Sequence, residues 1–326
     1  MTSTRYFVIG GAGFIGSHLV EALAPLGAVT VFDDLSVGRR EFIAPALESG
    51  RARLVVGNVL DLPALEAAIA DHDVVFHLAA NPEARWGLER TRLDLEQGTI
   101  ATYNVLEAMR RRGVTRLLFA SSGTVYGDTP EPCAEGELGK LPISLYGASK
   151  LAGEALVSAF VECFGLKAWI CRFGNVVGPR GTHGAALDFL KKLERDPEEL
   201  EVLGDGRQSK PYLHVSDCVA ALSFIIERAH GPLEIFNIAP SDFTTVQRIA
   251  ELCIAASPYP SAGIRFGGGP RGWPGDIATS RLDASRLGEL GFRLRYTSDQ
   301  AVAHAVSALA REVFGDTANP APLAVP

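Results

Sequence analysis

The regular alternation of short apolar segments with helix-like segments constrains the fold of this chain more than any other feature. Apolar segments that predict strands span residues 6–9, 28–32, 53–56, 73–80, 116–120 and 167–171. Segments with helical periodicity lie between them, at 14–26, 62–70, 93–112 and 145–164. Strands that alternate with helices pack as a parallel sheet with helices on both faces. We therefore expect an α/β fold built on a doubly wound parallel sheet, with ligands at the carboxyl ends of its strands.

A glycine-rich turn follows the first strand and opens the first helix. Gly10, Gly13 and Gly16 recur at every third position, a variant of the spacing of dinucleotide-binding turns. Glycine lets the backbone approach a pyrophosphate, and the N-terminus of the next helix offers free N–H groups to it. A tight turn without a ligand would also account for three glycines. The position between a strand and a helix favours dinucleotide binding, and hence a Rossmann domain.

An acidic residue ends the second strand. Asp33 lies 20 residues after Gly13, where a carboxylate accepts the ribose hydroxyls of NAD and repels the 2′-phosphate of NADP. Two observations keep other interpretations open. Arg39 and Arg40 follow closely and would suit NADP, and Asp33 could simply cap its strand. The pattern favours NAD as the cofactor.

Tyr146 and Lys150 are four residues apart in the helix predicted at 145–164, so both side chains lie on one face. A nearby ammonium lowers the pKa of a phenol, which makes Tyr146 a candidate general base near neutral pH. The same spacing also occurs on ordinary solvated helices. Ser122, just past the strand at 116–120, could hydrogen-bond a substrate hydroxyl or relay its proton, or only satisfy its own turn.

The strand–helix rhythm ends at a Gly-Pro pair, where we place a domain boundary. Residues 1–178 are expected to form an NAD-binding Rossmann domain, to which residues 213–240 return. Residues 179–212 and 241–314 are expected to form a smaller C-terminal substrate domain. The segment 315–326 lacks apolar periodicity, and we expect it to be a disordered tail.

Composition narrows the classes of function. Acidic residues outnumber basic ones by 38 to 31, and the net charge of −7 argues against a nucleic-acid partner. The run Arg110–Arg112 closes a predicted helix, where cations suit the dipole, which favours a solvated helix end over a phosphate-binding patch. Five cysteines without paired spacing fit reduced, buried thiols and a cytoplasmic location. We expect no signal peptide before the strand that begins near Arg5, and no membrane-spanning segment.

Together the motifs of this chain resemble the extended short-chain dehydrogenase/reductase family, and within it the nucleotide-sugar epimerases. The UDP-galactose (UDP-glucose) 4-epimerase group is the most similar, particularly its archaeal-type members. The resemblance extends to about residue 314 and rests on GGAGFIG at 10–16, Asp33, HLAA at 77–80, SSGTVYG at 121–127, YGASK at 146–150, RFGN at 172–175 and GDGRQSKPYLHV at 204–215.

The resemblance implies a catalytic trio and a set of cofactor contacts. Tyr146 would be the base, Lys150 would lower its pKa and hold the nicotinamide ribose, and Ser122 would complete the trio. The residues implied to bind NAD are Gly10, Gly13, Phe14, Ile15, Gly16, Asp33, Asp34, Asn58, Val59, Leu78, Ala79, Ala80, Tyr146 and Lys150.

The resemblance also implies residues for a UDP-sugar substrate. Thr124 would touch the sugar, Asn175 and Lys210 would bind the diphosphate, and Asp276 would hold the uridine ribose. Lys210 stands where many members carry arginine, so the charge is kept and the bidentate geometry is lost. Asn58 replaces an aspartate that usually meets the adenine amino group, and its amide oxygen can still accept that bond.

Two positions separate activities within the family. Similar dehydratases carry Asp-Glu before Val-Tyr-Gly, and similar decarboxylases carry Glu there. This chain has Gly123 and Thr124 instead. Without that acid, the resemblance implies the 4-epimerisation of a UDP-hexose, UDP-glucose or UDP-galactose, through a transient 4-keto sugar in carbohydrate metabolism.

Several alternatives stay open. The substrate could be UDP-glucuronate or UDP-N-acetylglucosamine, because Arg85 could meet a carboxylate and Ser280 would leave room for an N-acetyl group. A non-catalytic, NAD-sensing or RNA-associated protein could share the fold, although such proteins commonly lose the tyrosine or the lysine. A reductase with net redox would consume added NADH. Family members are usually homodimers, which implies an interface formed by the helices predicted at 93–112 and 145–164. The scattered histidines predict no metal site.

Overall fold

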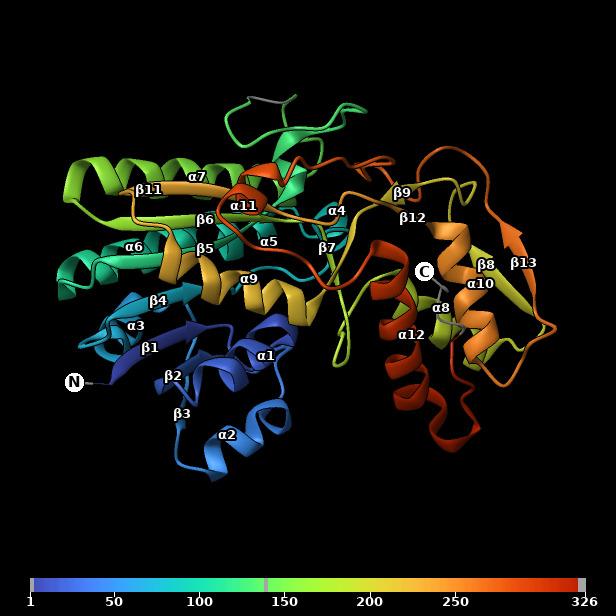
Figure 1. Cartoon of the computed structure of the whole chain (residues 1–326), viewed down its shortest axis with the longest axis horizontal. Helices are drawn as coiled ribbons and strands as arrows, with labels where there is room; N and C mark the ends of the chain where they lie inside the picture. Colours follow the sequence, from blue (N-terminus) through green and yellow to red (C-terminus); the bar gives the residue numbers. More distant parts are fainter. Residues whose placement is uncertain (1–2, 138–139, 322–326) are drawn as a thin grey trace. The chain divides into compact units, whose positions relative to one another are not determined.

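We describe the chain from a computed structural model, which places residues 3–137 and 140–321. These residues form two compact units, and Figure 1 shows the elements of each. The first unit comprises Met1–Val125, Leu145–Arg172 and Val219–Phe236, and the second comprises Tyr126–Ser144, Phe173–Cys218 and Asn237–Pro326. Each unit therefore combines segments that are distant in the sequence.

A seven-stranded sheet lies at the centre of the first unit. Its strands are β1 (Thr4–Ile9), β2 (Gly27–Asp33), β3 (Ala52–Val56), β4 (Val74–His77), β5 (Arg116–Ser122), β6 (Lys167–Phe173) and β11 (Leu233–Ile238). They lie in the order β11-β6-β5-β4-β1-β2-β3. β1 is parallel to β2 and β4, β2 is parallel to β3, and β4 is parallel to β5. Every residue of β4 is buried, as expected where helices cover both faces. The predicted doubly wound α/β fold is confirmed.

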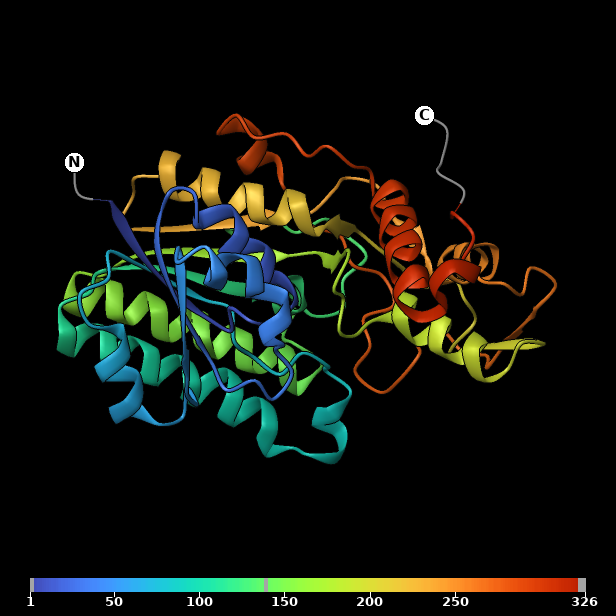
Figure 2. The same ribbon diagram turned by 90° about the horizontal axis from the view of Figure 1, so that it is seen from below.

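Helices cover both faces of this sheet. They are α1 (Phe14–Leu23), α2 (Ala44–Glu48), α3 (Leu62–Ile69), α4 (Trp86–Glu89), α5 (Arg92–Asp94), α6 (Ala101–Arg112), α7 (Leu145–Phe164), α9 (Val215–Arg228) and the short 3₁₀ turns η1 (Arg40–Ile43) and η3 (Gly123–Tyr126). α6 and α7 lie side by side on one face, and α9 covers the other (Figures 1 and 2). Val105 of α6 and Val157 of α7 belong to one buried cluster with Phe7 and Phe119 of the sheet. This apolar layer fixes α7 against β5.

The helix predicted over residues 93–112 is not one continuous α-helix. α5 ends at Asp94, and a π-helical segment, η2 (Leu95–Ile100), precedes α6. Gly98 of η2 lies against α7, because a Cβ on it would be 2.3 Å from the hydroxyl oxygen of Ser149. A π-helical turn is often found at a functional site. Apolar periodicity does not distinguish one π turn from an α turn, so the prediction missed it.

The second unit is built from short strands and three longer helices. Its elements are β7 (Asn175–Val177), β8 (Glu199–Val202), β9 (Ser209–Lys210), β10 (Tyr212–His214), β12 (Thr244–Thr245), β13 (Gly263–Phe266), α8 (Ala185–Arg195), α10 (Val246–Ala256), α11 (Ser285–Glu289), α12 (Ser298–Phe314) and the 3₁₀ turn η4 (Gly315–Thr317). The strands pair as β10 with β7, β12 with β9 and β13 with β8. Leu190 of α8, Leu252 of α10 and Val306 of α12 share a second buried core. The sequence pattern missed β8 and β13.

The start of α12 shows how a cap extends a helix beyond its apolar pattern. The apolar periodicity of the last helix begins only at residue 302, so the sequence pattern alone predicts a start there. It begins at Ser298 instead, because Thr297 and Gln300 form a reciprocal capping box.

The disorder expected for residues 315–326 is wrong for the part that the structure describes. Asn319 donates from its side chain to the carbonyl oxygen of Ser257 at 2.8 Å, and Ala321 is buried. Isolated polar bonds of this kind leave no periodic trace in a sequence. Residues 322–326 lie outside the described residues.

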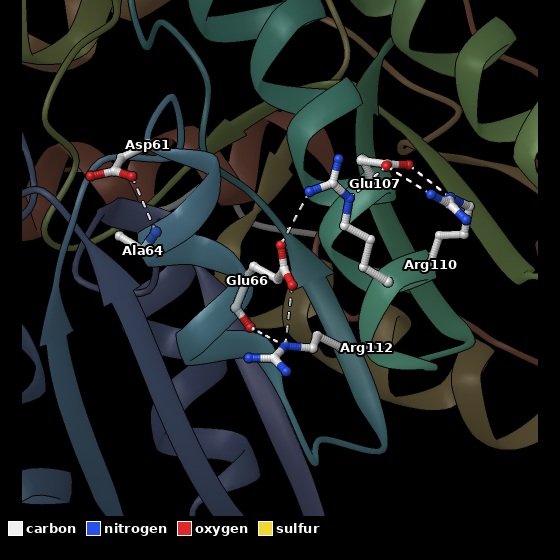
Figure 3. A network of polar contacts seen from close by, with 7 residues as sticks. Asp61, Ala64, Glu66, Glu107, Arg110 and Arg112 are labelled. Carbon is white, nitrogen blue, oxygen red and sulfur yellow. Dashed lines mark hydrogen bonds and ion pairs between the residues drawn. The ribbon is translucent and has the colours of Figure 1, made fainter.

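The basic run at the end of α6 is paired with acidic side chains (Figure 3). Arg110 and Arg111 donate to the carboxylate of Glu107 at 2.8 and 2.7 Å. Arg112 donates to the backbone carbonyl oxygen of Glu66 at 3.0 Å. The hydrogen bonds from Arg110 and Arg111 lower the pKa of Glu107 to about 2. Two carboxylates, those of Glu66 and Glu107, thus offset part of the charge of the three arginines at this helix end.

The cysteines are free thiols, and most are buried. Cys133, Cys171, Cys218 and Cys253 are buried, whereas Cys163 is exposed on α7. Within residues 3–137 and 140–321, no three or more His, Cys, Asp or Glu side chains form a cluster that could hold a metal ion. No helix in the same ranges has the length and apolar character needed to cross a membrane.

Candidate active site

The glycine turn between β1 and α1 leaves no room for side chains. Gly10 has a φ of +77°, and a Cβ on it would lie 2.8 Å from the backbone nitrogen of Ala79. A Cβ on Gly16 would lie 2.1 Å from the carbonyl oxygen of Gly10. Gly13 occupies the N-cap position, so no side chain caps α1 at this residue. The bare helix N-terminus at Phe14 therefore suits the oxygens of a pyrophosphate.

Two backbone N–H groups hold Asp33 at the end of β2. Its Oδ2 accepts from Ala12 and its Oδ1 accepts from Leu35, each at 2.9 Å. Burial raises the pKa of Asp33, and these two hydrogen bonds act in the opposite direction. Each carboxylate oxygen keeps a further lone pair, which a ribose hydroxyl could use. Ala12 belongs to the glycine turn, so its hydrogen bond to Asp33 links this turn directly to the carboxylate.

Asn58 and Asp34 contact each other next to this acid. Asn58 Nδ2 donates to Asp34 Oδ2 at 3.2 Å, and Asn58 Oδ1 accepts from the backbone N–H of Leu60 at 2.8 Å. The amide oxygen keeps one lone pair, so a bond from an adenine amino group is chemically available. The neighbouring Val59 is buried.

The segment after β4 packs against the glycine turn. β4 is hydrogen-bonded to β1, and the backbone N–H of Leu78 donates to the carbonyl oxygen of Ile9 at 3.0 Å. The carboxyl ends of two strands therefore bring two separate motifs together, as in other doubly wound sheets. The predicted cofactor residues assembled here are Gly10, Gly13, Phe14, Ile15, Gly16, Asp33, Leu78, Ala79 and Ala80.

The predicted catalytic trio converges from β5 and α7. Lys150 Nζ donates to the carbonyl oxygen of Ala120 at 2.7 Å and lies 5.8 Å from the centre of the Tyr146 ring. Ser122, at the end of β5, acts on the hydroxyl group of Tyr146 through a hydrogen bond that lowers the pKa of this tyrosine. The end of β5 thus holds a partner for each member of the α7 pair. The anchoring carbonyl of Ala120 was not among the predicted site residues, because a backbone group carries no side-chain signal.

Thr124 orients Ser122. Its backbone N–H and its hydroxyl both donate to Ser122 Oγ, at 3.2 and 3.0 Å. These two bonds use both lone pairs of Ser122 Oγ, so the single Ser122 proton is left for Tyr146. The resemblance implied a contact between Thr124 and the sugar. The structure adds an orienting role that the sequence did not reveal.

The electrostatic balance at Tyr146 differs from the expectation. We predicted that Lys150 lowers the pKa of Tyr146. Instead, the pKa of Tyr146 is raised to about 12, by burial and then by the charge of Asp94, while the hydrogen bond from Ser122 acts against both. Burial lowers the pKa of Lys150 to about 8, although Glu154 and Asp94 act to raise it. In the protein alone, Tyr146 is therefore a phenol at neutral pH.

A buried ion pair fixes the middle of α7 to the sheet. Glu154 accepts from Arg172 of β6 at 2.9 Å on Oε1 and at 2.6 Å on Oε2. Ser121 of β5 donates to the same carboxylate at 2.5 Å. The carboxylate therefore ties one helix to two strands, one turn beyond Lys150. Arg172 lies in the quoted RFGN motif and Glu154 in the helix predicted at 145–164, but only the structure pairs them.

The residues predicted for the diphosphate and the uridine ribose all belong to the second unit. Lys210 Nζ donates to Asp276 Oδ1 at 2.7 Å, and the backbone N–H of Gly272 donates to Asp276 Oδ2 at 3.1 Å. The structure therefore brings Lys210 and Asp276 together. Asn175 opens β7 with an exposed side chain, and its backbone N–H donates to the carbonyl oxygen of Pro211 at 2.9 Å.

Two residues considered for sugar specificity are already bonded within their own units. Arg85 donates from Nε and Nη2 to the carboxylate of Glu83 at 3.1 and 3.0 Å. Ser280 donates its backbone N–H to the carbonyl oxygen of Ser209 at 3.4 Å. The bidentate pair gives Arg85 a counter-ion inside the protein, which weakens the case for a sugar carboxylate at this position.

Comparisons with known proteins agree with this geometry. The model of the NAD dependent epimerase/dehydratase family matches residues 6–239. The UDP-glucose 4-epimerase of Mycolicibacterium smegmatis is 31% identical over 317 residues, which cover 93% of this chain and 97% of the relative. A solved UDP-galactose 4-epimerase is 40% identical, with a TM-score of 0.85 over 95% of this chain and 100% of the other. The UDP-glucose 4-epimerase of Thermotoga maritima, solved with UDP-glucose, is 29% identical, with a TM-score of 0.84 over 95% of this chain and 99% of the other.

Proposed function

The chain belongs to the NAD-dependent epimerase/dehydratase family, and from this membership we propose that it interconverts UDP-glucose and UDP-galactose at C4. The observation that carries the proposal is the convergence of Ser122, Tyr146 and the buried Lys150 in the unit that also holds the glycine turn. The protein would then be an NAD-dependent isomerase of carbohydrate metabolism.

NAD fits the residues of the first unit. The turn at Gly10 and Gly16 excludes side chains where a pyrophosphate would approach. The carboxylate of Asp33 suits a ribose with two free hydroxyls and disfavours a 2′-phosphate. NAD held there would supply the acceptor for the hydride of C4 and the donor for its return.

Tyr146 moves the proton of the reaction. Once the ligands are bound, Tyr146 acts as a phenolate, whose oxygen removes the proton of the 4-hydroxyl while the C4–H bond breaks and the C4 carbonyl forms. Ser122, oriented by Thr124, donates to the tyrosine oxygen and stabilises its negative charge. Once the 4-keto sugar has turned its other face, Tyr146 gives the proton back to the C4 oxygen as the carbonyl is reduced, and the configuration at C4 is inverted. The cycle has no net redox change.

The turn after β5 supplies no acid for competing chemistry. Elimination of a hydroxyl group needs a side chain that protonates the leaving oxygen. Gly123 has no side chain, and the hydroxyl proton of Thr124 is directed at Ser122. Within a family that includes both epimerases and dehydratases, this favours epimerisation.

We assign the nucleotide part of the substrate to the second unit. Lys210 would bind the diphosphate with Asn175, and Asp276 would hold the uridine ribose. The bond between Lys210 and Asp276 supports this assignment, because it keeps a cation and an acceptor next to each other before a ligand arrives. A UDP-sugar has a partner for each of them: its diphosphate would meet the cation, and the hydroxyl groups of its ribose would meet the acceptor.

The alternatives have less support. UDP-glucuronate would need a free cation for its carboxylate, and Arg85 is paired with Glu83. UDP-N-acetylglucosamine stays a candidate through the small side chain of Ser280. A non-catalytic, NAD-sensing or RNA-associated role would not require the oriented trio of Ser122, Tyr146 and Lys150.

We also infer a homodimer formed through α6 and α7. Tyr103 of α6 and Phe164 of α7 are 44% and 51% exposed, and both rings lie against Phe160. Exposed aromatic groups on adjacent helices often mark a protein interface. Analytical ultracentrifugation tests this inference, and a purely monomeric protein would contradict it. The buried, free cysteines support a reducing compartment, and we assign the protein to the cytoplasm.

One experiment tests the function directly. The purified protein is incubated without added cofactor with UDP-galactose, UDP-glucuronate or UDP-N-acetylglucosamine, and the 4-epimers are measured by proton NMR. We expect UDP-glucose to form from UDP-galactose without accumulation of NADH. Conversion of only one of the other sugars would replace the substrate assignment. No conversion of any sugar, even with NAD added, would favour the non-catalytic alternative.

A further inference from the structure

Asp94, the last residue of α5, carries a buried carboxylate for which the proposed reaction has no role so far. The residue is 1% exposed. Its Oδ1 accepts from the side chain of Asn81 at 3.0 Å, whereas its Oδ2 has no hydrogen-bond partner among the described residues. A buried, half-satisfied carboxylate is costly unless a nearby positive charge compensates it.

The unpartnered oxygen lies near the start of α7. A Cβ on Gly87 would be 2.4 Å from Asp94 Oδ2 and 3.6 Å from Leu145 Cβ, so both atoms border the same small space. Leu145 is the first residue of α7, and Tyr146 follows it. The N-terminus of a helix favours a negative charge. The carboxylate therefore lies beside the end of α7 that carries the general base.

The charges of Asp94 and Lys150 act on each other. Burial raises the pKa of Asp94, while the bond from Asn81 and then the charge of Lys150 lower it. Conversely, the pKa of Lys150 is lowered by burial and raised by Glu154 and by Asp94. The coupling is reciprocal, as expected for an anion and a cation in one poorly solvated region.

The other titratable groups around the pair are committed or neutral. Glu154 also raises the pKa of Lys150, but its carboxylate is bonded to Arg172 and Ser121. His77 of β4 is neutral, because burial and then the charge of Lys150 lower its pKa to about 3. Asp94 is therefore the carboxylate with an oxygen left to balance the ammonium of Lys150.

We propose that Asp94 is a positioning residue for the Tyr146–Lys150 pair. Its carboxylate is the buried counter-charge that keeps Lys150 an ammonium and keeps Tyr146 a phenol until the ligands are bound. The effect of Asp94 on catalysis rests on the proposed function. The coupling between the charges of Asp94 and Lys150 does not. The epimerisation returns its proton in every cycle, so Asp94 acts as a fixed charge and breaks or forms no bond.

The variant Asp94→Asn tests the proposal, because it removes the charge and keeps an acceptor for Asn81. The ionisation of Tyr146 is followed, without substrate, by the absorbance of tyrosinate as the pH is raised. From the absorbance of the wild type and of Asp94→Asn we subtract that of the same protein carrying Tyr146→Phe, so that only the signal of Tyr146 remains. In Asp94→Asn the Tyr146 titration should move lower by about one pH unit, the size of a typical charge effect. Both limbs of the pH profile of epimerisation should move to lower pH. Loss of the Asp94 charge favours the tyrosinate form of Tyr146 and disfavours the ammonium form of Lys150.

Glu96→Gln is the matched control. It removes the same charge from the neighbouring η2 segment, where Glu96 pairs with the exposed Arg92. This variant should leave the titration of Tyr146 and the pH profile unchanged. A shift of equal size in Glu96→Gln would show a general effect of net charge and would overturn the assignment to Asp94.

Two further outcomes would also count against the proposal. One is an unchanged Tyr146 titration in Asp94→Asn. The other is failure of Asp94→Asn to fold, because an amide can make the bond that the carboxylate makes with Asn81. If the Tyr146 titration shifts as expected in Asp94→Asn but the wild type epimerises no sugar, the proposed function is wrong. The role of Asp94 as the counter-charge of Lys150 would still be supported.

Discussion

Lys150 donates from Nζ to the carbonyl oxygen of Ala120 at 2.7 Å. This bond joins α7 to the end of β5, two residues before Ser122. It uses one of the three donors of the ammonium and holds the side chain beside the Tyr146 ring. The geometry of the general base is therefore set by the contact between a helix and a strand end, as well as by spacing within the helix.

Replacing Tyr146 by Phe removes the proton acceptor and keeps the ring. Turnover of UDP-galactose should fall about a thousandfold, within the range of general-base contributions. The NAD content, measured after denaturation of the purified protein, should stay close to that of the wild type. Turnover near the wild-type value would contradict the assignment of Tyr146.

Thr124→Val removes the hydroxyl that orients Ser122 and keeps the shape of the side chain. We expect kcat to fall about tenfold with little change in KM, since one hydrogen bond is lost that acts on the base. Thr129→Val, in the exposed loop of the second unit, is the matched control and should behave as the wild type. A change in KM alone would instead indicate that Thr124 only contacts the sugar.

Glu154→Gln breaks a buried ion pair and leaves the guanidinium of Arg172 without its charge partner. Both side chains are less than 9% exposed, so the free energy of unfolding should fall by about 3–5 kcal/mol. Glu199→Gln breaks the exposed pair with Arg265 and should leave the midpoint of urea unfolding almost unchanged. Equal effects of the two variants would contradict a special role for the buried pair.

The stability of the protein should depend on Lys150 and pH in a defined direction. The pKa of Lys150 is about 8 in the folded chain and 10.5 in its ordinary state. Between these values the unfolded state binds more protons, so the wild type gains stability as the pH rises. Lys150→Met removes this term. The variant should be more stable than the wild type at neutral pH, and the difference should shrink between pH 8 and 10.5.

Denaturant unfolding at several pH values measures this difference, and epimerase activity is measured in parallel. We expect Lys150→Met to lose activity while it gains stability below pH 8, because a buried charge required by function is costly to the fold. A stability difference that is independent of pH would show that Lys150 is not buried as an ammonium.

The features that the sequence predicted are those with a local signal. The spacing of Gly10, Gly13 and Gly16 predicts one turn, and the four-residue step from Tyr146 to Lys150 predicts that both lie on one face of one helix. Strand and helix periodicities repeat within short segments, so the doubly wound sheet could be predicted from them. The boundaries were less accurate where a cap, as at Thr297, or a π-helical turn, as in η2, changed the local pattern.

What the sequence alone determined was thus the fold class, the glycine turn and the pair of side chains on α7, because each depends on neighbouring residues. Only the tertiary structure placed the carbonyl oxygen of Ala120 next to the ammonium of Lys150, 30 residues away, and the carboxylate of Asp94 near Leu145 at the start of α7. It also gave the Tyr146 pKa the direction opposite to the one expected, since burial and then the charge of Asp94 raise it. Burial and long-range charge depend on how the whole unit packs, and no spacing along the chain records them.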